Sequence, residues 1–245
     1  MRYAIISDIH SNLAAFQAVL QDIKQRGGVG RIWCLGDIVG YGPDPRECID
    51  LLREWDHVCV AGNHDWGALG KIDLSEFNPE AAEACRWTGR QLRPEDADYL
   101  DGLPLTVTEG DFTLAHGSPR EPIWEYLVSI YVAKASLAYF DTGFCLVGHS
   151  HVPVVFEQIT EDGDCVLQEI AAGDAVRLGQ NRLIINPGSI GQPRDHDPRA
   201  AYAIYDSDQN VIWCYRVPYD FASTQQKMLE HGLPLLLISR LSHGW

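Results

Sequence analysis

Between Tyr3 and Val147, short apolar runs alternate with longer stretches whose apolar residues recur at helical spacing. This alternation predicts βαβ units around a largely parallel sheet, because parallel strands need a long crossover connection that is usually helical. The runs with strand character are Tyr3–Ser7, Arg31–Leu35, His57–Ala61, Thr106–Glu109, Phe112–Ala115 and Phe144–Val147. The stretches with helical character are Leu13–Ile23, Pro45–Trp55, Ala81–Leu92 and Pro94–Leu100.

The pattern changes after His151, where short strands follow one another through turns. We expect these strands to form a second, mostly antiparallel sheet that begins with a hairpin and is followed by two closing helices. No linker separates the halves, so residues 1–245 are predicted to form a single domain with two sheets. The later strands and helices are predicted at Val152–Ile159, Cys165–Ile170, Arg182–Ile185, Ala201–Tyr205, Val211–Arg216, Phe221–Glu230 and Leu235–Leu241.

Five of the predicted strands run almost directly into a residue type that binds metal ions. In open α/β sheets, ligands bind in the crevice beyond the carboxyl ends of the strands. Gly36, Gly62, Gly117 and Gly148 let the backbone turn tightly at these points. We therefore expect a single site built from strand ends, and its candidate metal ligands are Asp8, His10, Asp37, Asn63, His116, His149 and His151.

The candidate ligands combine carboxylate, amide and imidazole groups and include no thiolate. That set suits manganese, iron, zinc or similar ions rather than a cysteine-bound structural zinc. Seven protein donors exceed what one catalytic ion uses, so the pattern predicts two divalent cations that share a bridging carboxylate. Two such ions are the usual device for in-line attack of water on phosphorus.

Five motifs occur in order along the chain: Asp8-Ile9-His10, Gly36-Asp37, Gly62-Asn63-His64-Asp65, His116-Gly117 and Gly148-His149-Ser150-His151. In this order they resemble the calcineurin-like metallophosphoesterase superfamily. A later loop, Asn186-Pro187-Gly188-Ser189, is similar to one in the small prokaryotic phosphodiesterase branch of that family. The resemblance implies an α/β fold, a four-layer α/β/β/α sandwich of two stacked mixed sheets flanked by helices.

The resemblance also implies a role for each motif residue. Asp37 would bridge two divalent cations, with manganese as the first candidate and iron, zinc, nickel or cobalt as alternatives. His64 would bind no metal; near its ordinary pKa of ~6.5 it would act as the general acid that protonates the leaving oxygen. The other ligands would divide between the ions, with Asp8, His10 and His151 on the first and Asn63, His116 and His149 on the second.

Two positions depart from the pattern of Ser/Thr protein phosphatases and diadenosine tetraphosphatases. Gly40 stands where their aspartate orients the catalytic histidine, and Tyr41 stands where their arginine clamps phosphate. Without that guanidinium, a monoester dianion loses its best partner, so phosphodiesters are the favoured substrates. Arg194 is a candidate replacement clamp, whereas Tyr41 either stacks on a substrate base or lies in a surface turn.

Two alternative functions stay open from the sequence. The first is a diadenosine tetraphosphatase or a Ser/Thr protein phosphatase-like phosphomonoesterase, against which the residues at positions 40 and 41 count. The second is a catalytically inactive, metal-bound binding module. An unliganded acid such as His64 has no purpose in a pure binding module, so we favour the enzyme.

The charge balance restricts the partners of the chain. With 19 Lys+Arg against 34 Asp+Glu, the net charge of −15 repels polyanions, so we expect neither long nucleic acid nor a membrane as a partner. A small phosphate ester stays a suitable substrate, because two divalent cations outweigh the carboxylates around them. Met1 leads directly into a predicted strand and the cysteines form no CxxC pair, which predicts a cytoplasmic protein. A homo-oligomer is compatible with these features.

Overall fold

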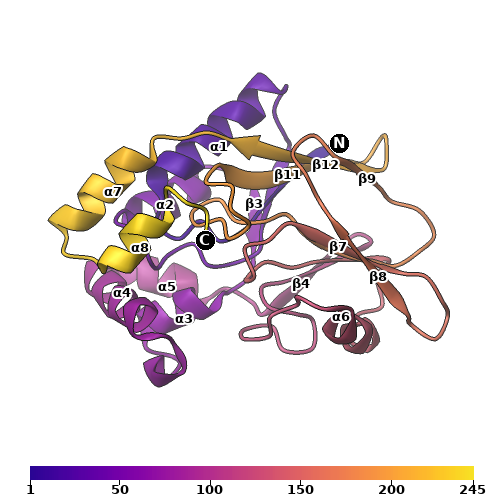
Figure 1. Ribbon diagram of the computed structural model, residues 1–245, viewed down its shortest axis with the longest axis horizontal. Helices are drawn as coiled ribbons and strands as arrows, with labels where there is room; N and C mark the ends of the chain where they lie inside the picture. The colour runs from indigo at the N-terminus through magenta and orange to yellow at the C-terminus, as the bar shows by residue number, and fades with distance from the viewer.

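Two six-stranded sheets stack face to face in the computed structural model, which describes residues 1–245 (Figure 1). The strand order is β3-β2-β1-β11-β12-β9 in the first sheet and β4-β5-β6-β10-β7-β8 in the second. The strands are β1 (Arg2–Ile6), β2 (Arg31–Cys34), β3 (His57–Cys59), β4 (Thr106–Glu109), β5 (Phe112–Ala115), β6 (Phe144–Leu146), β7 (Val154–Gln158), β8 (Cys165–Glu169), β9 (Ala175–Arg177), β10 (Leu183–Asn186), β11 (Ala200–Asp206) and β12 (Val211–Val217).

Eight α-helices accompany the sheets. Their order along the chain agrees with the predicted helices except for two short ones, α3 and α6, that the apolar spacing did not indicate. The helices are α1 (Leu13–Gln25), α2 (Pro45–Arg53), α3 (Asn63–Leu69), α4 (Pro79–Gln91), α5 (Pro94–Asp101), α6 (Ile130–Ser136), α7 (Phe221–Glu230) and α8 (Leu235–Arg240).

Each sheet draws strands from both halves of the chain, so the expected division into an early parallel sheet and a late antiparallel sheet is wrong. β1 and β2 pair in parallel as predicted, but β11 returns antiparallel on the other edge of β1. In the second sheet, β10 lies between β6, to which it is parallel, and β7, to which it is antiparallel. A central apolar strand needs partners on both edges, and its sequence does not specify which strands supply them.

Three buried clusters hold the layers together, and their composition explains the four-layer arrangement. Phe16 and Leu52 pack α1 and α2 against the outer face of the first sheet. Leu35 and Leu146 belong to a cluster that fills the space between the two sheets. Leu137 and neighbouring residues of the α6 region cover the outer face of the second sheet. The α/β/β/α sandwich predicted from the resemblance is therefore confirmed.

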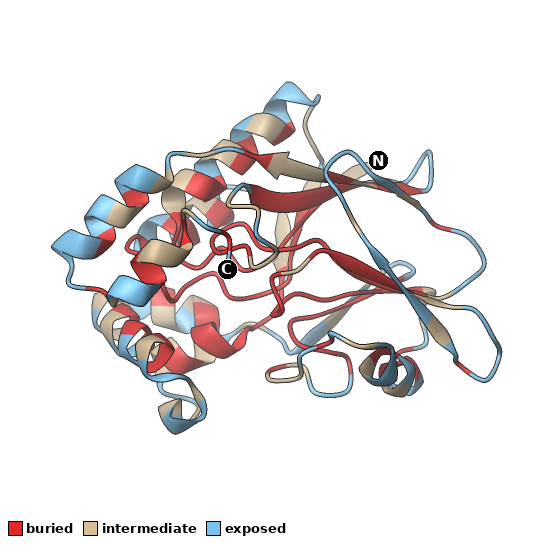
Figure 2. Ribbon diagram, viewed as in Figure 1, coloured by how far each residue is buried: buried red, intermediate tan, exposed pale blue.

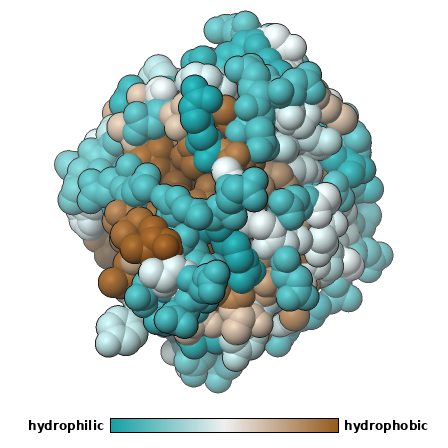
Figure 3. Space-filling view, turned by 90° about the vertical axis from the view of Figure 1, so that its right-hand side faces the viewer, coloured by the Kyte–Doolittle hydropathy of each residue, from teal (hydrophilic) through white to brown (hydrophobic).

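The loops that follow the strands stay buried as they leave the sheets, which is unusual for connecting segments. Figure 2 shows this as a continuation of the buried strands toward α3, α7 and α8. A fourth cluster, which includes Tyr41, Met228 and Leu237, packs α4, α7 and α8 over these loops. The other end of the sandwich is mostly hydrophilic at its surface (Figure 3). None of the helices combines the length and the apolar character needed to cross a membrane.

Candidate metal centre

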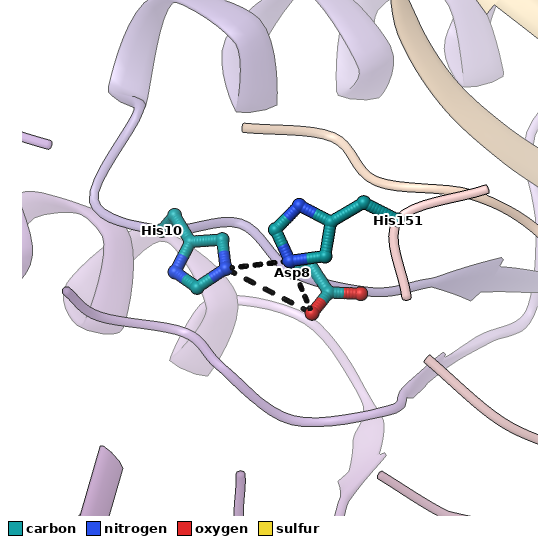
Figure 4. A group of neighbouring side chains, drawn as sticks. All are labelled: Asp8, His10 and His151. Carbon is teal, nitrogen blue, oxygen red and sulfur yellow. Dashed lines mark hydrogen bonds and ion pairs between the residues drawn. The ribbon is translucent and has the colours of Figure 1, made fainter. Parts of the chain in front are cut away.

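All seven predicted ligands converge at one end of the sandwich. Asp8, His10 and His151 form one group, in which His151 Nε2 lies 3.2 Å from Asp8 Oδ1 and 3.1 Å from His10 Nε2 (Figure 4). Asp37, His116 and His149 form a second group, and Asp37 also lies within ligand distance of His10 and His64 in a third. Asn63 joins the second group, because its Oδ1 lies 3.0 Å from His116 Nε2. All seven side chains are buried.

Most of these ligands lie on left-handed backbone, which is uncommon outside glycine. Such a conformation costs on the order of 1–3 kcal/mol at each residue and persists only where the surroundings enforce it. The buried strand-end loops provide that enforcement by pairing their backbone groups; for example, the His10 N–H donates to the Asp37 carbonyl at 3.0 Å. The five ligands with positive φ are Asp8, His10, Asp37, His149 and His151.

The glycines beside the candidate ligands are needed because neighbouring backbone segments lie very close to one another, more than because the chain turns tightly there. Among the four predicted turn glycines, Gly36 alone has a positive φ, at +89°. Gly62 has an ordinary φ, but a Cβ at this position would lie 2.0 Å from Asp37 Oδ1 and 2.5 Å from the Asp37 nitrogen. Gly62 is therefore required because the β2 and β3 loops touch here, which corrects the expectation of a turn.

Asp65 fixes the loops after β2 and β3 in one arrangement. Its carboxylate accepts backbone N–H groups from Asp37 at 2.9 Å, Val39 at 3.1 Å and Gly62 at 3.0 Å. The Gly62 contact also begins α3, because the side chain of the third helical residue caps the start of the helix. This capping explains why a helix starts inside the motif that carries Asn63 and His64.

The carboxylates and imidazoles of the centre shift one another's pKa values. Burial raises the pKa of Asp37, but the neighbouring imidazoles, His116 foremost, outweigh burial and hold it well below its usual value. Burial lowers the pKa of His116, yet Asp37 and Asp8 raise it to about 9. The negative charge at Asp37 is thus strong enough to hold a proton on an adjacent buried imidazole.

The donor atoms fit a pair of divalent cations. Asp37 Oδ1 accepts a backbone N–H of α3 at 2.8 Å, whereas Oδ2 is buried without a hydrogen-bond partner. Oδ2 lies 3.3 Å from His116 Nε2 and 3.6 Å from His10 Nε2, so it faces both groups at once. Imidazole nitrogens also face each other at 3.1 Å in the pairs His10–His151 and His116–His149. Without a metal ion each of these contacts needs a proton between the two nitrogens, whereas bound cations would accept the lone pairs of both.

His64 lies beside the ligands, with its ring enclosed by Tyr41 at 4.2 Å and Phe77 at 5.0 Å between centroids. Its Nδ1 lies 3.3 Å from Cys85 Sγ on α4. A Cβ on Gly40 would lie 2.6 Å from the same nitrogen, so no side chain at position 40 has room to orient the ring. The side chain that contacts this nitrogen is Cys85 instead. The spacing of the motifs did not indicate that Cys85 lies beside His64.

The protonation of His64 differs from the expectation. Burial lowers its pKa to about 4, with Asp37 opposing the shift and Arg194 adding to it. The predicted ordinary pKa is therefore wrong, and the ring is neutral at neutral pH. A thiol that donates to Nδ1 leaves the ring proton on Nε2.

Two tyrosines cover the centre. Tyr41 is buried rather than in a surface turn, because its ring packs on His10 at 4.5 Å and joins the α4–α7–α8 cluster. Tyr126, which the motifs did not indicate, stacks on His149 at 3.9 Å. Arg194 donates from Nη2 to the Tyr41 hydroxyl at 3.2 Å, so the predicted clamp does reach the site.

Comparison with known proteins places these motifs in a family. The sequence model of the calcineurin-like phosphoesterase superfamily domain matches residues 1–210. The chain belongs to the calcineurin-like phosphoesterase superfamily. This result confirms the resemblance, and it makes the chain a metallophosphoesterase whose candidate metal-binding residues are those described above.

Relatives within the superfamily differ in how much of the chain they match. An uncharacterized protein of Methanocaldococcus jannaschii is 44% identical over 246 residues, covering 98% of this chain and 97% of the relative. The crystal structure of a metallophosphoesterase from Sphaerobacter thermophilus is 46% identical, with a TM-score of 0.89 and coverage of 100% and 99%. A symmetrical bis(5′-nucleosyl)-tetraphosphatase of Pseudomonas putida is 30% identical over 87 residues, which is 32% of this chain and 30% of that enzyme.

Replacing Gly62 with alanine is expected to weaken Mn²⁺ binding at least about tenfold, because the added Cβ displaces the Asp37 carboxylate. Titration calorimetry on metal-free protein measures the affinity. Gly179→Ala is the matched control, since a Cβ there meets nothing within 4 Å. Equal affinities for Gly62→Ala and wild type, with both proteins folded by circular dichroism, would contradict the assignment of Asp37 as a ligand.

Proposed function

We propose that this metallophosphoesterase hydrolyses small phosphate esters, phosphodiesters above all, with two divalent cations and with His64 as the general acid. The first cation takes Asp8, His10, Asp37 and His151, and the second takes Asp37, Asn63, His116 and His149. Manganese is the proposed metal. The observation that carries the proposal is the position of Asp37 Oδ2, buried, unpartnered and facing both groups of donors.

When bound, the cations supply Lewis acidity toward phosphoryl oxygens and a nucleophilic water at neutral pH. The chain itself holds the side chains of the site in place and keeps water out. Asp37 is held on its Oδ1 side by the first turn of α3, so its orientation does not depend on the ligand. The buried walls of the site exclude bulk water, which strengthens every electrostatic contact with the ester.

His64 directs its second nitrogen toward the reacting group in this proposal. Nδ1 is occupied by Cys85, so Nε2 is the nitrogen available to the leaving oxygen. The ring acts as the acid in its protonated form, which the negative charge of a bound ester favours. Nδ1 then donates to Cys85 Sγ, and Nε2 transfers its proton to the leaving oxygen, which leaves a neutral imidazole and the free alcohol. The rings of Tyr41 and Phe77 prevent His64 from turning away.

Diesters are favoured over monoesters because of the contacts available to the phosphate. Tyr41 offers a neutral hydroxyl and ring where a phosphatase-type arginine would offer two charged N–H donors. A diester carries one negative charge on its phosphate and needs less compensation than a monoester dianion. The tetraphosphatase alternative rests on a similarity that covers 32% of the chain, and it enters as one arm of the test.

The Mn²⁺-loaded protein is expected to cleave bis(p-nitrophenyl) phosphate with a higher kcat/KM than p-nitrophenyl phosphate. Asp37→Asn is expected to lower turnover of both at least about 100-fold, because both cations lose their shared ligand. Steady-state kinetics on these substrates, a phosphopeptide and diadenosine tetraphosphate measure the preference.

Each other outcome has a definite meaning. Cleavage of monoesters or phosphopeptides alone would reverse the preference for diesters, and cleavage of diadenosine tetraphosphate alone would favour a tetraphosphatase. Full turnover by Asp37→Asn would contradict the bridging role. Absence of turnover with every substrate and metal would leave a binding module.

His64→Ala is expected to slow the phenyl ester of thymidine 5′-phosphate at least about tenfold more than the p-nitrophenyl ester, because nitrophenolate leaves without a proton. Single-turnover rates on the two esters give the comparison. His231→Ala removes an exposed imidazole of the same size and serves as the control. An equal loss on both esters would show that His64 supports the site without acting as the acid.

A further inference from the structure

Two guanidinium groups converge on one neutral amide oxygen beside the metal centre. Arg194 Nη2 lies 3.1 Å and Arg240 Nη1 3.5 Å from Gln192 Oε1. Arg194 also donates to the Tyr41 hydroxyl, and Arg240 Nε donates to a main-chain oxygen of Trp245, the last residue of the sequence, at 2.7 Å. Neither arginine pairs with an Asp or Glu side chain, although the chain has 34 acidic residues against 19 basic ones.

This arrangement leaves the charge of Arg194 without an acidic partner and leaves hydrogen-bonding capacity unused. Burial and the nearby Arg194 lower the pKa of Arg240, and Glu80 on α4 opposes the shift without forming an ion pair. Gln192 is 1% exposed, and its Nε2 has no hydrogen-bond partner. Two half-buried positive charges and a buried amide N–H without a partner lower the stability of the folded protein. A bound anion would offset this cost by accepting hydrogen bonds from all three groups.

The pair is directly connected to the metal centre. The main-chain oxygen of Gln192 lies 2.5 Å from His151 Nδ1. The Arg194 guanidinium lies 5.9 Å from the centre of the Tyr41 ring, which also packs on His10 and His64. An anion held by the two arginines would therefore lie next to the Tyr41 ring, which packs on His10, and next to Gln192, which contacts His151.

We propose that Arg194, Arg240 and Gln192 form a second anion site that holds an additional phosphate group of the substrate. This inference rests on the proposed function only in assigning the reacting phosphate to the metal centre. Guanidinium groups match phosphate oxygens through paired N–H donors, and two of them favour a phosphate with more than one charge. The substrate class is thus a compact phosphodiester with a second phosphate, such as a phosphorylated nucleotide ester.

The second anion site also gives the C-terminal helices a role. α8 carries Arg240 on its last residue, and Leu237 and Leu241 pack beside Tyr41 and Met228 in the cluster that covers the centre. Figure 1 shows α8 against the central loops, far along the chain from the motifs. α8 therefore adds a positive charge beside the candidate metal centre of an acidic protein.

Kinetics with matched esters test the site. The p-nitrophenyl ester of thymidine 5′-phosphate that also carries a 3′-phosphate is expected to have a KM about tenfold below that of the ester without it. Arg240→Gln is expected to bring the ratio of the two KM values close to one, and Arg240→Lys to restore part of it. Arg90→Gln removes the same charge from an exposed position of α4 and is expected to leave the ratio unchanged.

Binding without turnover separates this inference from the proposed function. Titration calorimetry is expected to show that Mn²⁺-loaded protein binds methylenediphosphonate at least about tenfold more tightly than methylphosphonate, and that Arg194→Gln or Arg240→Gln removes this difference. That result supports the second anion site even if no ester is cleaved. An unchanged difference in both variants would overturn the site. So would an Arg240→Gln protein that is less stable yet keeps the wild-type KM ratio, which would show that Arg240 only anchors Trp245.

Discussion

The structure depends on the burial of two carboxylates and four imidazoles whose ligand atoms, within each candidate metal group, all lie within 4.8 Å of one another. Buried charges of this kind are unstable unless they are paired and oriented. The chain meets this requirement with backbone groups: Asp37 Oδ1 is held by the start of α3, and Asp65 ties the loops after β2 and β3 together. The left-handed backbone at most of the candidate ligands is a consequence, because these loops must turn their side chains inward and still pack closely against one another.

The fold supplies the rigidity that such loops need. The sheets fix one end of each loop, and the cluster of α4, α7 and α8 covers the other end. The Tyr41 and Tyr126 rings pack directly on the imidazoles of two candidate ligands, His10 and His149, so aromatic side chains cover part of the centre. In this buried site, local charge decides what binds, whereas the net charge of −15 acts mainly on long polyanions that must approach the whole surface.

Much of the centre was predictable because its ligands follow strands directly in the sequence. The spacing from Ile6 to Asp8, or from Cys34 to Asp37, places a donor at a strand end whichever strands become neighbours. Pairing between strands was not predictable, as the positions of β10 and β11 show, because an apolar strand accepts many partners. The roles of Cys85, Tyr126 and Arg240 depend on contacts between distant segments, and no local spacing marks such contacts. The low pKa of His64 has the same origin, since burial is a property of the packed fold.

We propose that Asp37 lies between two cations. Anomalous diffraction at the manganese edge, from crystals of Mn²⁺-loaded protein, tests it most directly. We expect two anomalous peaks, with Asp37 Oδ2 in contact with both. One peak would be bordered by Asp8, His10 and His151, and the other by Asn63, His116 and His149. A single peak, or two peaks of which one does not touch Asp37, would contradict this proposal.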